Sequence, residues 1–251
     1  MPSQLIHLDV AAAALAGGRS PAWPPGGEAG DALLLGAIAP DAWVVAGLTR
    51  QATHFWSLDD DTSGAARLAR THPLVADPRR ADRLPARARA YLAGYHCHLV
   101  TDEQWTFTVY RPAFGRRSRF AASAEGMHTQ RALQAALEQD LRDQRGDDLA
   151  AWLAAIARAG PPPALPFLDG AAVERWRDLQ LEGAGLPTSE SAFRHVMARS
   201  GRPGAAEAAA ALARRGAALT AAARAHVPAA ALATFRARAV AGCAAVLAAW
   251  R

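Results

Sequence analysis

His98 and Asp102 are the residues whose types and spacing most clearly suggest chemistry. They lie four residues apart in the run GYHCHLVTDE at residues 94–103. On a helix this spacing places two side chains on one face, one turn apart. An imidazole beside a carboxylate suits a zinc-like divalent cation. Two ligands do not complete such a site, so the pair predicts further ligands elsewhere in the chain.

Three more candidate ligands lie upstream in mostly apolar surroundings. They are His7 in LIHL, Asp41 in GAIAPD and His54 in THFW. Each has an ordinary reading when it is taken alone: Asp41 can cap a helical turn, and the two histidines can be buried core residues. A set of histidines and aspartates together is more typical of a metal site. The five residues together therefore favour metal binding.

The ordered blocks GAIAPD, THFW and GYHCHLVTDE, preceded by a histidine near the N-terminus, resemble the zinc-dependent phospholipase C family. The single-strand-specific zinc nucleases have a similar arrangement of metal ligands. The resemblance covers about residues 3–110. It implies a phosphoric ester hydrolase in which a metal-bound water attacks phosphorus. It also implies a multi-helix bundle around the metals, with Asp41 as a ligand and a possible catalytic base.

The five ligands divide into two sets. Asp41, His54 and His98 would form one three-ligand site, and Asp102 could reach a second ion held partly by His7. A carboxylate shared by two cations holds them about 4 Å apart, where they can clamp the attacking and leaving oxygens of a phosphoester.

A third metal is not expected. Members of the resembled family add a further histidine and then an HxxxE pair. Here His128 is followed four residues later by Ala132. We therefore predict one or two zinc ions, although His128 or His195 could still be recruited.

Two further groups keep alternative interpretations open. The arginines after the motif could hold phosphate through bidentate hydrogen bonds or lie in a solvated loop. The aromatic residues near the ligand blocks could line a pocket or belong to the core, and core is favoured for Trp56 and Tyr95. The arginines are Arg111, Arg116, Arg117 and Arg119; the aromatics are Trp43, Trp56, Tyr95 and Trp105.

The rest of the pattern predicts an all-α fold, because no segment alternates as a half-buried strand would. Residues 1–160 are predicted to form a metal-binding helical core. Residues 161–251 are predicted to form a C-terminal helical region packed on that core as one domain. Helices are expected over 4–16, 31–38, 86–109, 123–144, 149–159, 169–182, 189–199 and the alanine-rich 204–250, with a break at 227–228.

Composition narrows the classes of partner. The 251 residues carry a formal net charge of +5 that comes from arginine, since the sequence contains no lysine. No nucleic-acid-binding motif accompanies this charge, so no stable nucleic-acid partner is expected. The N-terminus lacks the pattern of a secretory signal, and no run approaches 18 apolar residues. These features predict a cytoplasmic protein without a membrane span.

The sequence thus favours a zinc-dependent phosphodiesterase of the phospholipase C type, acting on a phosphoester substrate. The family name suggests a phospholipid head group, and a nuclease-like phosphodiesterase is the closest alternative. A different class is a non-catalytic helical protein with a structural metal and an interaction surface. A closed coordination sphere would distinguish that class from an enzyme.

Overall fold

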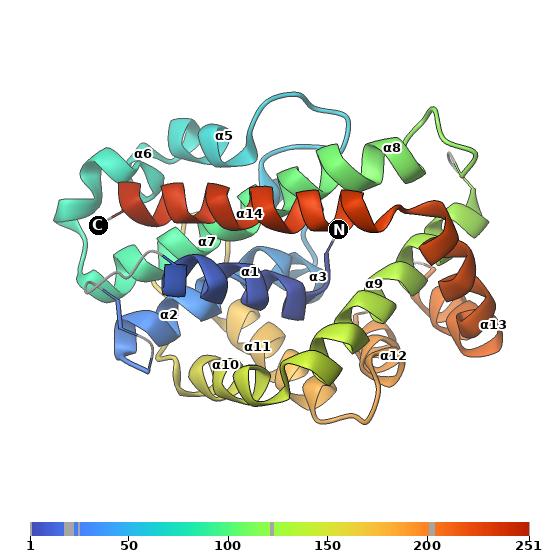
Figure 1. Cartoon of the computed structure of the whole chain (residues 1–251). Coiled ribbons are helices and arrows are strands. Elements are labelled where there is room, and N and C mark those ends of the chain that lie inside the picture. Colours follow the sequence, from blue (N-terminus) through green and yellow to red (C-terminus); the bar gives the residue numbers. More distant parts are fainter. Residues whose placement is uncertain (1, 18–22, 25, 121–122, 201–203, 251) are drawn as a thin grey trace.

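Helix α7 (Ala86–Trp105) lies inside the molecule and carries both His98 and Asp102. All ten of its residues from 90 to 99 are buried, as expected of a helix covered on every side. Helices α1 (Gln4–Gly17), α2 (Glu28–Gly36), α5 (Gly64–Thr71) and α14 (Ala229–Ala249) pack against it. Figure 1 shows α14 lying alongside α1 and α7, so the end of the chain covers its beginning.

Two glycines let α2 and α7 cross at very short range. A Cβ atom on Gly36 would lie 2.0 Å from the carbonyl oxygen of Tyr91, and one on Gly94 would lie 1.9 Å from that of Leu33. No side chain fits at either position, so only glycine permits this approach. Gly36 begins the GAIAPD block and Gly94 begins the HxxxD block. The same crossing therefore brings the two ligand-bearing segments together.

The motif helix continues further than expected. After Trp105 the backbone forms a π-helical turn, η3 (Thr106–Tyr110), and then a short helix, α8 (Arg111–Phe114). Pro112 occupies the first turn of α8, where its missing N–H costs nothing, and the helix ends at Gly115. The sequence pattern predicted that this helix would end at 109; instead the chain stays helical, and Pro112 lies in the first turn of α8.

The computed structural model of the chain describes residues 2–17, 23–24, 26–120, 123–200 and 204–250, and within these residues the predicted all-α fold is confirmed. They contain no strand, only an isolated bridge between Leu165 and Leu168. The break predicted at residues 227–228 separates α13 from α14. The remaining elements are η1 (Ala39–Ala42), α3 (Trp43–Ala46), α4 (Arg50–His54), α6 (Pro73–Ala76), η2 (Pro78–Arg83), α9 (Ala124–Gln144), α10 (Gly146–Arg158), α11 (Gly170–Ala184), α12 (Ser189–Arg199) and α13 (Ala205–His226).

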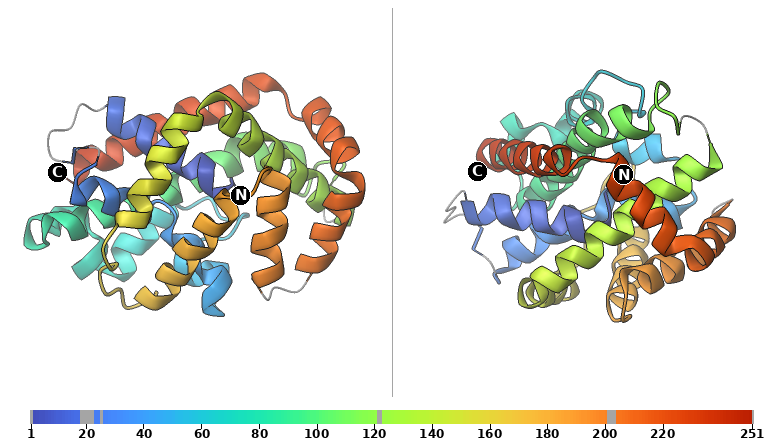
Figure 2. Two further views of the ribbon diagram at one scale, coloured as in Figure 1. Left: turned by 90° about the horizontal axis from the view of Figure 1, so that it is seen from below. Right: turned by 45° about the vertical axis from the view of Figure 1, so that its right-hand side comes forward.

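The helices bury two hydrophobic clusters of unequal size. The large cluster includes residues from Leu5 to Trp250 and surrounds α7. The small cluster consists of Ala132, Leu212 and Leu219, where α13 packs on α9. Figure 2 shows α9, α12 and α13 grouped at one end of the molecule, away from the free end of α14.

Candidate metal centre

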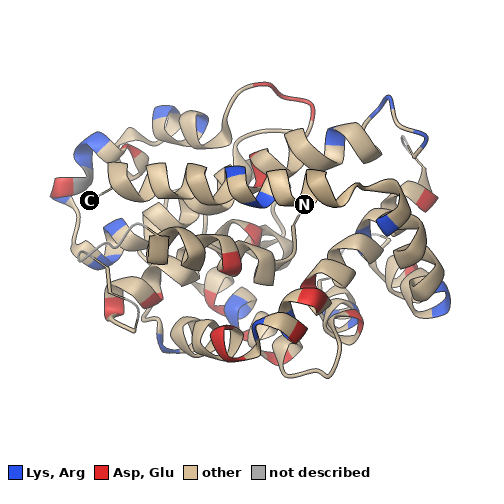
Figure 3. Ribbon diagram, viewed as in Figure 1, with Lys and Arg blue, Asp and Glu red and all other residues tan. Residues whose placement is uncertain are grey.

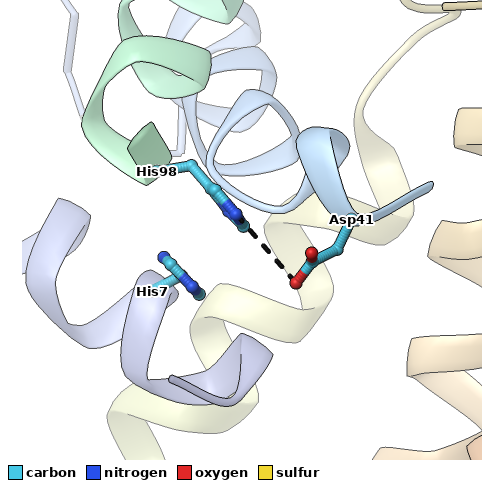
Figure 4. Close-up of side chains that lie close together, drawn as sticks. All are labelled: His7, Asp41 and His98. Atoms are coloured by element: carbon cyan, nitrogen blue, oxygen red, sulfur yellow. Dashed lines mark ion pairs between the residues drawn. The ribbon is translucent and has the colours of Figure 1, made fainter. Parts of the chain in front are cut away.

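The five predicted ligands come from four separate elements and meet at one place. Helix α1 supplies His7, η1 supplies Asp41, α4 supplies His54, and α7 supplies His98 and Asp102. Figure 4 shows His7, His98 and Asp41 directed toward one another, with an ion pair of 4.0 Å between His98 Nε2 and Asp41 Oδ2. Both histidines and Asp102 are almost fully buried, whereas the Asp41 side chain is 15% exposed.

His54 lies at the centre of the group. Its Nε2 atom is 3.3 Å from Asp41 Oδ1, 3.3 Å from His98 Nε2 and 3.2 Å from Asp102 Oδ2. Zinc bonds of about 2.0–2.1 Å in tetrahedral geometry place neighbouring ligand atoms about 3.3–3.4 Å apart. The three distances at His54 are close to this spacing, whereas those from His98 Nε2 to Asp41 Oδ2 and to Asp102 Oδ2 are longer, at 4.0 Å and 3.8 Å. The group could therefore hold a metal ion.

The hydrogen bonds behind two of the histidines orient them as ligands. His98 Nδ1 lies 2.8 Å from the carbonyl oxygen of Ala37, and His54 Nδ1 lies 3.2 Å from that of Arg50. A carbonyl oxygen only accepts, so each Nδ1 carries the proton and each Nε2 presents its lone pair. This arrangement is characteristic of metal-binding histidines, because it fixes both the tautomer and the ring orientation.

His7 stands beside this set rather than within it. Its ring stacks on that of His98 with 3.8 Å between centroids, and its Nε2 lies 3.4 Å from Asp102 Oδ1. Both of these atoms are buried and make no hydrogen bond within the described part of the chain. Asp102 thus turns one oxygen toward His54 and the other toward His7. Buried histidine and aspartate groups of this kind could hold one cation, and the shared carboxylate allows a second.

The electrostatic environment keeps the ligands in the protonation states that a cation needs. Burial alone raises the pKa of Asp41, but the adjacent His54 and His98 side chains outweigh this and hold the pKa well below its usual value. Burial likewise opposes ionisation of Asp102, yet His54, His7 and Arg50 lower its pKa. Burial lowers the pKa of His98 to about 3, so its imidazole is neutral at pH 7.

Two residues that the sequence analysis missed also contact the ligands. Arg50 donates from Nη2 to Asp102 Oδ2 at 2.6 Å, and Gln4 donates from Nε2 to Asp41 Oδ2. Arg50 lies one turn before His54 on α4, and Gln4 lies three residues before His7 on α1. Helical spacing from a predicted ligand was therefore the signal that could have identified both.

A cavity of about 780 Å³ opens onto the centre at Asp41 and Arg50. Of the five predicted ligands, all of them in the described part of the chain, Asp41 is the one that lines this cavity. Its walls come from the start of α1, from α9 and from the pair α11 and α12. Asp41 is therefore the ligand that a molecule in the cavity reaches first.

Arg111 and Arg116, two of the four arginines that follow the motif, pair with acidic residues away from the centre. Arg111 donates to Asp61 at 2.8 Å and to the backbone oxygens of Leu58 and Asp60, and Arg116 pairs with Asp59. Their hydrogen bonds tie down the acidic segment that follows α4. Of the two interpretations, this favours a structural loop over phosphate binding, since Arg50 is the arginine at the metal centre.

The other histidines of the motif and the C-terminal half lie outside the centre. His96 packs edge-on against Trp250, and burial lowers its pKa to about 4. His195 pairs with Glu182 on the far pair of helices. Among the described residues, the groups able to hold a metal contain neither His128 nor His195. Glu103 accepts from Ser63 Oγ and the Gly64 backbone, so it supports α5.

The aromatic residues divide between the core and the cavity. Trp56, Tyr95 and Trp105 are fully buried, in agreement with the core interpretation. Tyr95 also donates to the carbonyl oxygen of Thr53 at 2.6 Å, and so supports the residue before His54. Trp43 instead lines the cavity and donates from Nε1 to Asp41 Oδ1 at 3.2 Å.

Surface charge and helix composition add two observations. Basic and acidic residues are interspersed along the helices (Figure 3).

Within the described residues, α14 is long and apolar enough to cross a membrane by length and composition, and α2 with the following bent segment passes the same test only as a pair. In this structure α14 packs on α1 and α7 through buried residues that include Phe235 and Leu247.

Comparisons with protein-family models, with curated proteins and with solved structures found no match to this chain. A function can therefore be inferred from the side chains of the centre and of the cavity beside it.

Proposed function

We propose that this protein is a metal-dependent phosphoric ester hydrolase, a phospholipase C-like phosphodiesterase that uses one or two zinc ions. One observation carries the proposal: a group of buried histidines and aspartates, with ligand atoms close enough together to hold a metal ion, opens at Asp41 onto a large cavity. A purely structural site has no need of such an opening, whereas a catalytic one must admit substrate.

A zinc ion held by His54, His98 and Asp102 would keep a fourth position for water, would lower the pKa of that water from 15.7 toward about 7 and would neutralise charge on a phosphoryl oxygen. The remaining work falls to the protein's own side chains. Asp41 faces the cavity and accepts hydrogen bonds, so it orients the attacking water. Gln4 and Trp43 hold its carboxylate in place.

Arg50 has the position and charge to bind the phosphate. Its guanidinium lies at the junction between Asp102 and the cavity, with 16% of the side chain exposed. Guanidinium groups bind phosphate oxygens through directed, charge-assisted hydrogen bonds. In the proposed reaction Arg50 holds a non-bridging oxygen and stabilises the charge that develops as the water attacks.

One observation favours a second candidate function, a structural metal in a non-catalytic protein. His54, His98 and Asp102 are at most 1% exposed, and Arg50 already neutralises one oxygen of Asp102. A centre closed in this way would stabilise the fold without turnover.

Metal content and hydrolysis, measured on the same samples, separate the two functions. The purified chain should bind one or two equivalents of zinc and hydrolyse bis(p-nitrophenyl) phosphate or a phospholipid. His54→Ala should lose both properties, because His54 contacts three other ligands. His195→Ala is the matched control, because that histidine pairs with Glu182 away from the centre. Tight zinc binding without hydrolysis of any phosphoester would support the structural function instead.

A further inference from the structure

The cavity beside the metal centre has two chemically different walls. One wall is apolar and aromatic, with contributions from α8, the following loop, the first turn of α9 and α12. Its members include Phe114, Phe120, Met127, Phe193, Val196 and Met197. Flat ring systems pack well against phenylalanine and methionine side chains. This wall therefore suits an aromatic group as well as it suits a hydrocarbon.

The facing stripe of α9 is polar. It consists of Gln130, Gln134, Glu138 and Arg142, each four residues after the last, with Arg131 beside Gln130, so that one side of the helix turns toward the cavity. Helix faces that turn inward usually carry apolar residues. A hydrocarbon chain in the cavity would remove water from this stripe and return no hydrogen bonds, which is unfavourable. The occupant must therefore carry polar atoms along one side.

The unmatched groups of the stripe specify the kind of polar atom. Gln134 is 5% exposed, and its Oε1 accepts a hydrogen bond from Arg131 at 3.1 Å, which fixes Nε2 as its free donor. Gln134 Nε2, Gln180 Nε2 and Arg142 Nε are buried and make no hydrogen bond within the described residues. All three are donors, two on α9 and Gln180 on α11, whereas Gln4 Oε1 is a buried acceptor of the same cavity with no hydrogen bond within the described residues. The complementary ligand therefore presents mainly acceptors, such as carbonyl oxygens or ring nitrogens, with a donor for Gln4.

We propose that this cavity binds the organic group of the phosphoester substrate, and that this group is an acceptor-bearing aromatic ring system of nucleoside size. The inference rests on the hydrolase function proposed above and assigns its substrate class. A cavity of about 780 Å³ lies within the range that binds small organic molecules. With the phosphate at Arg50 and Asp41, the ring lies between the polar stripe of α9 and the aromatic wall.

Three phosphodiesters that all release p-nitrophenol test the assignment: the methyl, octyl and thymidine 5′ esters of p-nitrophenyl phosphate. For the zinc-loaded protein, kcat/KM for the thymidine ester should exceed that for the methyl ester by about ten-fold or more, since hydrogen-bonding pockets discriminate strongly. The octyl ester should gain little over the methyl ester. An octyl ester hydrolysed as well as the thymidine ester would overturn the proposal in favour of a lipid chain.

Variants of α9 locate the preference. Gln134→Leu and Gln130→Leu replace polar cavity residues with apolar ones of similar size, and each should reduce the ratio of thymidine to methyl ester rates. Gln144→Leu makes the same change at an exposed position of α9 outside the cavity and should leave the ratio unaltered. An unchanged ratio in both cavity variants would contradict the proposed pocket.

Calorimetric binding of thymidine 5′-monophosphate distinguishes failure of this inference from failure of the hydrolase proposal. Hydrolysis of the methyl ester with no thymidine preference would keep the hydrolase and remove the pocket assignment. Binding of the monophosphate that weakens in Gln134→Leu, without hydrolysis of any ester, would keep the pocket and remove the hydrolase. Absence of both binding and thymidine preference would overturn the inference.

Discussion

The surroundings of the metal centre and the helix pair α9–α13 stabilise the same fold with very different side chains. Around the centre, α2 and α7 cross so closely that only glycine fits at the points of contact. The two helices bury large residues such as Leu33, Tyr91 and Tyr95. Between α9 and α13 the separate cluster contains Ala132, Leu212 and Leu219, and α13 otherwise buries alanines. Ligand atoms must be held to within about 0.5 Å, which the close packing around α7 can provide and loosely packed alanines need not.

The largest expected effect breaks the centre itself. Asp102→Asn keeps the shape of the side chain but removes the charge that faces His54, His7 and Arg50. We expect the variant to keep its helical fold, to lose about one equivalent of zinc, and to lose activity by more than about 100-fold, because even outer-shell partners of a metal contribute 10–100-fold. Metal analysis, circular dichroism and phosphodiester hydrolysis measure the three quantities.

A lower melting temperature with no change in metal content would contradict this role for Asp102. Asp148→Asn is a suitable control: Asp148 also pairs with an arginine, Arg145, but on the exposed surface of α10.

The next expected effect compares the two clusters by the same truncation. Leu33 is fully buried in the large cluster, and Leu33→Ala should lower the free energy of unfolding by about 4 kcal/mol. Leu219 lies in the small cluster beside α9, where neighbouring helices can close around a void, so Leu219→Ala should cost about 2.5 kcal/mol. Urea titrations of both variants provide the values. Equal losses would show that the two regions are packed alike.

The sequence predicted the centre better than it predicted the cavity, for a physical reason. Histidine and aspartate in HxxxD spacing are unusual in an apolar helix, so His98, Asp102 and their upstream partners were recognisable, and the structure brings them together. The polar stripe of α9 was not recognised, because Gln134 and Glu138 on a helix usually indicate a solvated face. Only the packing of α12 on α9, with α11 lining the same cavity, turns that face inward.

Arg50 and the arginine loop illustrate the same limit. Four arginines after the motif attracted attention by their number, yet Arg111 and Arg116 bind the acidic segment after α4. A single arginine one turn before His54 reaches Asp102 instead. Pairing partners 50 or more residues apart depend on the fold, which no local pattern encodes.

A smaller effect tests the crossing that positions the ligands. A methyl group at Gly94 would lie 1.9 Å from Leu33 O and 2.9 Å from Ala37 N, both backbone atoms that cannot yield. Gly94→Ala should force α2 and α7 apart and lower the free energy of unfolding by about 3 kcal/mol. It should also weaken zinc binding, because Asp41 and His98 lie on the displaced segments. Denaturant titration and zinc competition assays give the two values.

The smallest effect has the opposite sign and comes from the same substitution in the other region. Gly216 lies within α13, where a Cβ atom would approach only the end of the flexible Glu190 side chain, at 3.1 Å. Alanine restricts the unfolded chain more than glycine does, so Gly216→Ala should stabilise the protein by about 0.7 kcal/mol and leave zinc affinity unchanged. Melting temperatures of the Gly216→Ala and Gly94→Ala variants, measured side by side, then compare the packing of the two regions. If both variants lose stability, α13 is packed as tightly as α7; if neither does, the close crossing of α2 and α7 is not what holds the centre together.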